Sequence, residues 1–220
     1  MAHIGILCPD MSGHLNPVMS LARQLQHRGH RVTFYQRLLT QKKVEDAGFE
    51  CSPFGTDVFP IEKTRAELTK LAALKGRTAF KFSIDLFCQR AAVCLREVPT
   101  MVRQQGVEAM LIDQVCPEGA VVAEELGLPH ATVSPALILH RDNTVPPFFT
   151  HWRYSTGFLP MLRNRFAYFM MNRLATRMMK ILNSHRQPRG MSRWREFHDA
   201  LSSRLQLSQQ PREFEFPRSV

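Results

Sequence analysis

The sequence predicts an α/β fold in which a parallel sheet is covered by helices on both faces. Short apolar segments alternate with helical patterns through the first 134 residues. Glycines stand where several of these helical patterns end, at Gly29, Gly48 and Gly127. Since parallel strands are joined by crossover connections that usually contain a helix, this alternation indicates a Rossmann-like arrangement.

The individual elements follow from apolar periodicity and turn residues. The predicted strands span residues 3–8, 30–35, 49–53, 107–113 and 129–134. The predicted helices span residues 17–27, 40–47, 62–75, 79–105 and 117–126. The first of these helices is expected to begin at Pro17 with Asn16 as its N-cap, because proline lacks only an N–H that is unbonded in the first turn.

The chain becomes helical and basic after Pro147. Phe, Leu and Met recur at every fourth position from Phe158 to Leu182, which predicts one apolar helical stripe. Such a stripe is typical of a helix that packs on the core and turns its charged face to solvent. Two other interpretations stay open, namely a lid over an apolar ligand and a face that contacts an anionic membrane.

Length and composition indicate one globular domain of 220 residues, with 44% hydrophobic and 22% charged residues. Within it we expect an α/β core at 1–147, a mostly helical basic segment at 148–204 and an extension at 205–220. No signal peptide and no apolar run of about 20 residues is evident, so we expect a cytoplasmic protein, with peripheral membrane contact left open. Five scattered cysteines indicate reduced, buried thiols.

The net charge of +10 is confined to one segment. Residues 143–195 contain no Asp or Glu and ten Lys or Arg residues, which equal the whole excess. The segment has no recognisable nucleic-acid motif and few aromatic residues that look exposed, so a nucleic-acid partner is not expected.

Two polar residues follow predicted strands at the edge of the sheet where ligands bind. His14 comes after the first strand, and Asp113 ends the fourth. These strands commonly lie side by side where the strand order reverses, so the two side chains could meet. A carboxylate on one imidazole nitrogen would fix the tautomer and let the other nitrogen activate an alcohol. The alternatives are that His14 assists the helix cap and that Asp113 accepts backbone N–H bonds.

No sequence motif indicates nucleotide-phosphate binding, metal binding or a cysteine nucleophile. Neither GxGxxG nor GxxxxGK[ST] occurs, so the first turn is not built for a nucleotide pyrophosphate. The remaining histidines lack metal-ligand spacing, and we assign no metal. Cys116 lies near Asp113, but a buried structural thiol is the expected state.

Several segments resemble the N-terminal domain of the UDP-glycosyltransferase family, whose members have the GT-B fold. They are HIGILCPDMSGHLNPVMSLARQLQHRGHRVTFY, the strand VEAMLIDQ, EGAVVAEELGLPHATVSPAL and the C-terminal SRLQLSQQPREFEFPR. The resemblance extends over nearly the whole chain, and it is most similar to bacterial enzymes that glucosylate zeaxanthin and macrolides.

The resemblance implies that His14 is the general base, that Asp113 supports it and that Gly13 lets the backbone approach the donor. It also implies an inverting, metal-independent transfer from a UDP-sugar to a hydroxyl of a hydrophobic small molecule. The family's second domain, which holds the UDP-sugar, is not in this sequence, so we expect no cofactor on this half and no activity without a donor-binding domain or subunit. The alternative is a non-catalytic module that binds an apolar ligand or a partner subunit.

Overall fold

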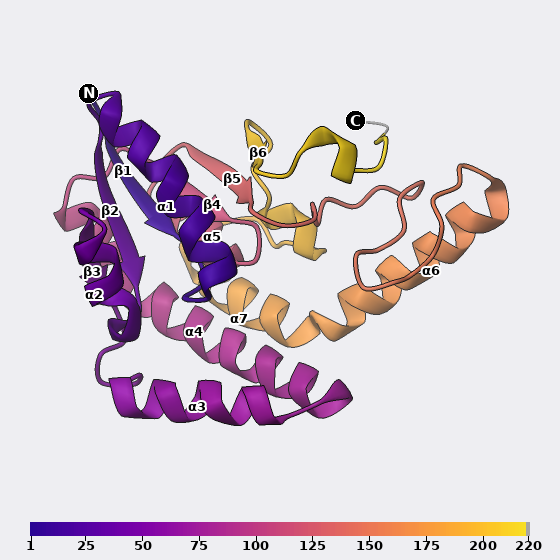
Figure 1. The fold of residues 1–220 in the computed structure, drawn as a ribbon, viewed down its shortest axis with the longest axis horizontal. Coiled ribbons are helices and arrows are strands. Elements are labelled where there is room, and N and C mark those ends of the chain that lie inside the picture. The colour runs from indigo at the N-terminus through magenta and orange to yellow at the C-terminus, as the bar shows by residue number, and fades with distance from the viewer. Residues whose placement is uncertain (219–220) are drawn as a thin grey trace.

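The computed structural model describes residues 1–218, and in this range the chain forms one six-stranded parallel sheet (Figure 1). The strands are β1 (His3–Leu7), β2 (Arg31–Gln36), β3 (Glu50–Pro53), β4 (Ala109–Asp113), β5 (His130–Ser134) and β6 (Gln206–Ser208). They lie in the order β3-β2-β1-β4-β5-β6, and every pair is parallel. The predicted α/β class is confirmed, and the strand order reverses between β1 and β4.

Helices cover both faces of the sheet. They are α1 (Ser12–His27), α2 (Leu38–Asp46), α3 (Ile61–Ala73), α4 (Gly76–Gln104), α5 (Pro117–Glu125), α6 (Phe158–Leu174) and α7 (Thr176–Arg186). Residues of α1 and α2 form one apolar cluster with one side of the strands, and residues of α4, α5 and α7 form a second cluster on the other side. Ile6 belongs to the first cluster and its neighbour Leu7 to the second, as the alternation of a strand requires.

The start of α1 differs from the prediction. The helix begins at Ser12, five residues before Pro17, and Met11 rather than Asn16 is its N-cap. Pro17 therefore lies inside the helix and has no N–H to donate to the carbonyl of Gly13. The earlier start makes Leu15 part of the core, where its side chain is fully buried, and this burial outweighs the local preference for proline in the first turn.

The segment after Pro147 also differs from the prediction. The apolar stripe is divided between two helices that meet at Ala175, and its two halves have opposite environments. Met178 and Leu182 of α7 are buried, as expected for a core-packing helix. The residues of the stripe in α6 are exposed, so the interpretation of α6 as a core helix with a solvated basic face is wrong.

The C-terminal extension contributes the last strand of the sheet. β6 pairs with β5, and the Gln209 side-chain amide donates to the carbonyl oxygen of Pro17 in α1. Short 3₁₀ turns at Gln187–Arg189, Phe197–Ala200 and Arg212–Phe214 complete the fold. The final two residues of the predicted extension 205–220 lie outside the described residues.

A buried ion pair connects β1 with the helices behind it. Arg90 of α4 pairs with Glu118 of α5, and both residues are nearly inaccessible, at 3% and 1% exposure. The Arg90 guanidinium also donates to the carbonyl oxygen of Cys8, at the end of β1, over 3.0 Å. This one side chain therefore positions the connection between β1 and α1.

Replacing Arg90 with methionine should lower the free energy of unfolding by about 3–5 kcal/mol at neutral pH, because Glu118 is left as a buried charge without a partner. Burial raises the pKa of Glu118, so acid protonates this carboxyl and removes the charge. The difference between R90M and the wild type should therefore shrink from about pH 7 to about pH 4.

Urea unfolding followed by circular dichroism measures both effects. K42M is the matched control, since it breaks an exposed Lys42–Asp46 pair and should change stability by less than about 0.5 kcal/mol. Equal losses in R90M and K42M would contradict the account of the buried pair.

Candidate functional site

The candidate site lies at the carboxyl ends of β1 and β4, the two strands between which the strand order reverses. Leu7 pairs with Ile112, so the residues that follow these strands emerge side by side. Helix α1 starts directly after β1, and His14 is its third residue. Asp113 is the last residue of β4. In open α/β sheets this is the crevice in which ligands bind.

The structure brings His14 and Asp113 into contact, as the strand positions predicted. His14 Nδ1 lies 2.8 Å from Asp113 Oδ2. The other carboxylate oxygen, Oδ1, accepts the backbone N–H of Val115 over 3.0 Å. Both oxygens of Asp113 thus have donors, and its side chain is completely buried, so its orientation is fixed. The sequence also left open that Asp113 accepts only backbone N–H bonds. This is true of Oδ1, whereas Oδ2 contacts His14.

This geometry makes Nε2 of His14 the nitrogen that is available for chemistry. A carboxylate accepts hydrogen bonds, so Nδ1 carries the proton and Nε2 keeps its lone pair in the neutral ring. The His14 side chain is 19% exposed, which leaves one edge open to a ligand. The arrangement can accept a proton from an alcohol while Asp113 stabilises the resulting imidazolium.

Gly13 precedes His14 in the first turn of α1. A Cβ atom at this position would meet no described atom within 4 Å, and its backbone does not have a positive φ angle. Neither packing nor backbone conformation therefore requires glycine here. The predicted approach of a donor at Gly13 is compatible with this open space and stays a prediction.

A small hollow of about 110 Å³ lies beside the loop that leads to His14. Its apolar lining comes from the loop and from α3 and α4, with Pro9, Leu68, Leu71, Leu86 and Phe87 among its residues. His14 is linked to this loop by its backbone N–H, which donates to the carbonyl oxygen of Met11 over 2.9 Å.

Three charged residues that line this hollow were missed by the sequence analysis. Asp10 forms an ion pair with Arg37, and Arg90 lies beneath the loop. Within the described part of the chain, Asp10 Oδ1 and Arg90 Nε are buried and have no hydrogen-bond partner. Asp10 could have been noticed from its place in the loop before His14, whereas Arg90 lies more than 70 residues away in the sequence and carries no local signal.

The thiols near the site are poor candidates for nucleophiles. Cys8 and Cys116 are fully buried, and burial raises the pKa of both thiols. A buried structural role for Cys116 is thus supported. Among residues 1–218, no group of three or more His, Cys, Asp and Glu side chains is placed to hold a metal ion.

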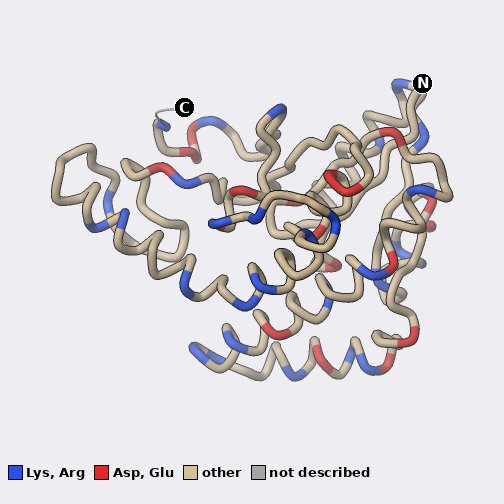
Figure 2. Tube along the Cα trace, turned by 180° about the vertical axis from the view of Figure 1, so that it is seen from behind, with Lys and Arg blue, Asp and Glu red and all other residues tan. Residues whose placement is uncertain are grey.

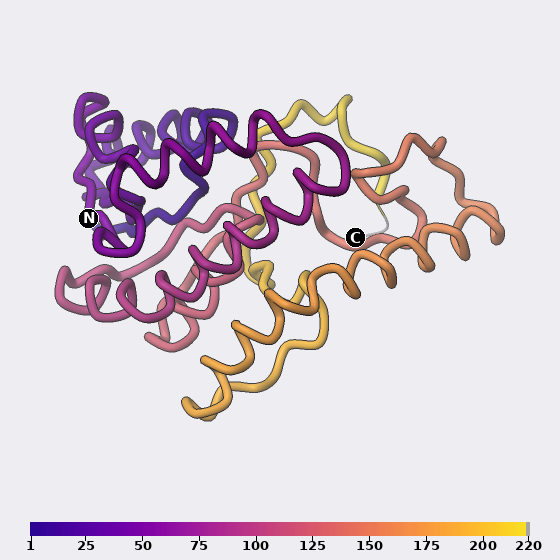
Figure 3. The backbone as a smooth tube through the Cα atoms, turned by 90° about the horizontal axis from the view of Figure 1, so that it is seen from below, coloured from indigo at the N-terminus to yellow at the C-terminus, as the bar shows by residue number. Residues whose placement is uncertain are grey.

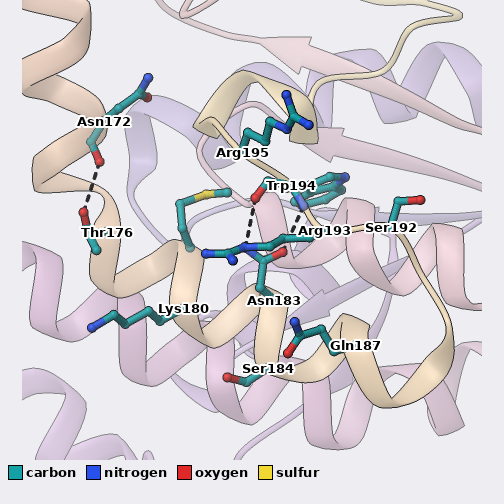
Figure 4. Close-up of a pocket in the computed structure, with 11 residues that line it drawn as sticks. Asn172, Thr176, Lys180, Asn183, Ser184, Gln187, Ser192, Arg193, Trp194 and Arg195 are labelled. Atoms are coloured by element: carbon teal, nitrogen blue, oxygen red, sulfur yellow. Dashed lines mark hydrogen bonds between the residues drawn. The ribbon is translucent and has the colours of Figure 1, made fainter.

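A larger hollow of about 970 Å³ lies elsewhere, between α7 and residues 192–195 (Figure 4). It shares no lining residue with the hollow near His14. The side chains of Lys180 and Arg193 are among its lining. It is therefore a separate feature and no part of the His14–Asp113 arrangement.

Comparison with solved structures identifies the architecture. The chain superposes on the glycotransferase of kitacinnamycin with a TM-score of 0.67 at 18% identity, over 97% of this chain and 47% of the other. The spinosyn forosaminyltransferase SpnP matches with a TM-score of 0.63 at 16% identity, over 99% of this chain and 48% of the other. The fold is one half of the GT-B fold. The predicted GT-B half-fold is thereby confirmed.

Sequence relatives of this GT-B half are glycosyltransferases as well. Zeaxanthin glucosyltransferase of Pantoea ananas is 28% identical over 220 residues, which is 100% of this chain and 51% of the relative. Zeaxanthin glucosyltransferase of Pseudescherichia vulneris is 25% identical over 221 residues, which is 99% of this chain and 51% of the relative. No family model matches the chain.

The GT-B half spans about half the length of the curated relatives that it matches. This coverage agrees with the predicted resemblance to an N-terminal acceptor domain. No helix within residues 1–218 is long and apolar enough to cross a bilayer.

Gly13→Ala should leave the free energy of unfolding unchanged or raise it by up to about 1 kcal/mol, because alanine favours a helix and the added methyl group has room. Gly119→Ala is the contrasting variant. Its Cβ would lie 2.8 Å from Leu7 Cδ2, and this overpacking should cost about 1–3 kcal/mol. Thermal unfolding of both variants checks the difference, and a Gly13→Ala loss as large as that of Gly119→Ala would show that packing requires Gly13.

Proposed function

We propose that this chain is the acceptor-binding, base-bearing half of an inverting glycosyltransferase that moves a sugar from a UDP-sugar to a hydroxyl of a hydrophobic small molecule. The contact of 2.8 Å between His14 Nδ1 and Asp113 Oδ2 carries this proposal. The similarity of the whole chain to glycosyltransferases supports it.

In the proposed reaction, Nε2 of His14 takes the proton of the acceptor hydroxyl. The acceptor oxygen then forms a bond to the anomeric carbon of the sugar, while the bond from that carbon to the diphosphate oxygen breaks and UDP leaves with the electron pair. Attack opposite the leaving group inverts the anomeric configuration. Asp113 keeps the imidazole in the correct tautomer and stabilises its charged form, with both carboxylate oxygens already held.

The proposed acceptor places one end in the hollow beside residues 9–11. A hollow of about 110 Å³ is smaller than the ~300 Å³ of a site that encloses a whole drug-sized ligand, so the rest of the acceptor extends outward. Its mainly apolar lining suits a hydrophobic molecule. Asp10 Oδ1 and Arg90 Nε, which have no partner among the described residues, would be satisfied by a polar group on the acceptor.

A chimera tests the proposal as an enzyme. This chain is joined to the remaining half of zeaxanthin glucosyltransferase of Pantoea ananas, and transfer from UDP-glucose to zeaxanthin and to a panel of hydrophobic alcohols is measured. We expect transfer by the chimera and none by residues 1–220 alone, because these residues match only about half the length of the glucosyltransferases.

In this chimera, His14→Ala should lower kcat by about 10²–10⁴-fold, since a general base contributes this much. Asp113→Asn should lower kcat as well, with acceptor KM little changed, because the residue acts through His14. His27→Ala is the matched control, since His27 is an exposed histidine at the other end of α1, and this variant should retain full activity. Full activity in His14→Ala would contradict the proposed base.

The second candidate is a non-catalytic binding module, which the mainly apolar lining of the small hollow favours. It predicts that the chain binds hydrophobic alcohols but that no chimera transfers sugar. Fluorescence titration of the chain with the same alcohol panel, beside the chimera assay, separates this candidate from the transferase.

A further inference from the structure

Helix α6 turns its apolar side to solvent. Seven of its large apolar residues are exposed, namely Phe158, Leu159, Leu162, Phe166, Phe169, Met170 and Leu174. Phe158 is 79% exposed and Phe166 is 63% exposed. At 100° per residue these seven positions fall within one side of the helix. We call them the apolar face of α6.

The opposite side of α6 holds the helix in this orientation through polar contacts. Asn164 is completely buried, and its side-chain amide donates to the carbonyl oxygen of Asn143 over 3.0 Å. The buried Tyr168 hydroxyl donates to the carbonyl oxygen of Val145 over 3.2 Å. Rotating the apolar face inward would break both bonds, so its exposure is part of the fold.

Helix α6 also extends away from the sheet, as the ribbon and the view from below show (Figure 1 and Figure 3). A contiguous apolar surface of this kind on a water-exposed helix marks an interaction site. The question is which partner covers it.

The segment of sequence that contains α6 carries positive charges only. Residues 143–195 contain ten Lys or Arg residues and no Asp or Glu. Figure 2 shows Lys and Arg positions, in blue, along the stretch of α6 and α7. In the described part of the chain, three of the ten form ion pairs, Arg177 with Asp85, Arg186 with Glu124 and Arg189 with Glu125. The other seven form no ion pair with an acidic side chain among residues 1–218, and they are Arg153, Arg163, Arg165, Arg173, Lys180, Arg193 and Arg195.

A basic hollow adjoins the end of α6. Asn172 of α6 lines it together with residues of α7 and of the segment 192–195. Figure 4 shows Lys180 and Arg193 around this hollow. Its described lining contains no acidic residue, so an anionic group is the ligand that suits it.

A partly exposed tryptophan lies against α6. Trp152 is 37% exposed, and the guanidinium of Arg163 lies 4.4 Å from the centre of its ring. Tryptophan and arginine are both suited to the level of lipid headgroups, where one end of each side chain is apolar and the other polar.

We propose that the apolar face of α6 lies on an anionic lipid bilayer, with Phe158, Phe166 and Phe169 in the acyl region and the unpaired cations at the headgroups. A bilayer is negative at its surface and apolar beneath it, so it matches both properties of this helix. A second copy of the chain would bring the same uncompensated positive charges together, and their repulsion opposes such a dimer. The proposal goes beyond sugar transfer and does not depend on it.

Flotation of the chain with vesicles tests the proposal. We expect binding to phosphatidylcholine vesicles that contain about 30 mol % phosphatidylglycerol, weaker binding to phosphatidylcholine alone, and loss of binding in about 0.5 M NaCl. Phe166→Ser with Phe169→Ser should reduce the partition coefficient at least about tenfold. Phe214→Ser is the matched control, since Phe214 is 70% exposed and lies in the C-terminal 3₁₀ turn, and it should bind normally.

The role of the positive charges in vesicle binding is tested by a separate double variant. Arg165→Glu with Arg173→Glu should weaken binding to the anionic vesicles by about fivefold or more per substitution, whereas Lys42→Glu on the exposed side of α2 should change it little. All substituted positions are exposed, so circular dichroism should show intact folding.

The proposal is overturned if anionic vesicles do not bind the chain, or if the double phenylalanine variant binds as well as the wild type. It is also overturned if the chimera with the second GT-B half fails to float, because that half would then cover the apolar face.

Discussion

The adjacency of β1 and β4 is the constraint on which the candidate site depends. The strand order reverses between them, so the connection after β1 and the end of β4 share one edge of the sheet. This adjacency brings His14 and Asp113 together from positions 99 residues apart. Arg90 supports the same place from behind by holding the carbonyl of Cys8 and the carboxylate of Glu118. Buried groups thus hold the segment that carries His14, whose side chain is partly exposed.

Much of the strand and helix pattern could be predicted from the sequence, because buried parallel strands are short apolar runs and helix ends carry glycine. The contact between His14 and Asp113 could be anticipated too, since both follow strands that commonly pair. The start of α1 could not be predicted from the sequence. It is decided by the burial of Leu15 and not by the preference of proline for the first turn of a helix. The orientation of α6 could not be predicted either, since periodicity shows that a helix has an apolar side but not whether that side faces the core or the solvent. Buried Asn164 settles this in the structure.

The two proposals place a hydrophobic substrate and a hydrophobic surface in one protein. The lining of the hollow beside residues 9–11 includes leucine, phenylalanine, proline and methionine side chains, and α6 presents phenylalanines to solvent. A protein that rests on a bilayer meets hydrophobic alcohols where they are concentrated. Each proposal nevertheless rests on its own residues, and one can fail while the other stands.

The tautomer of His14 tests the central claim most directly, and ¹⁵N–¹H correlation NMR of the imidazole measures it. The account predicts that Nδ1 carries the proton, held by Asp113, and that Nε2 has the chemical shift of a bare nitrogen. Asp113→Asn should lose this fixed preference. A wild-type ring protonated at Nε2, or one that averages both tautomers, would show that His14 is not prepared as a base and would contradict the account.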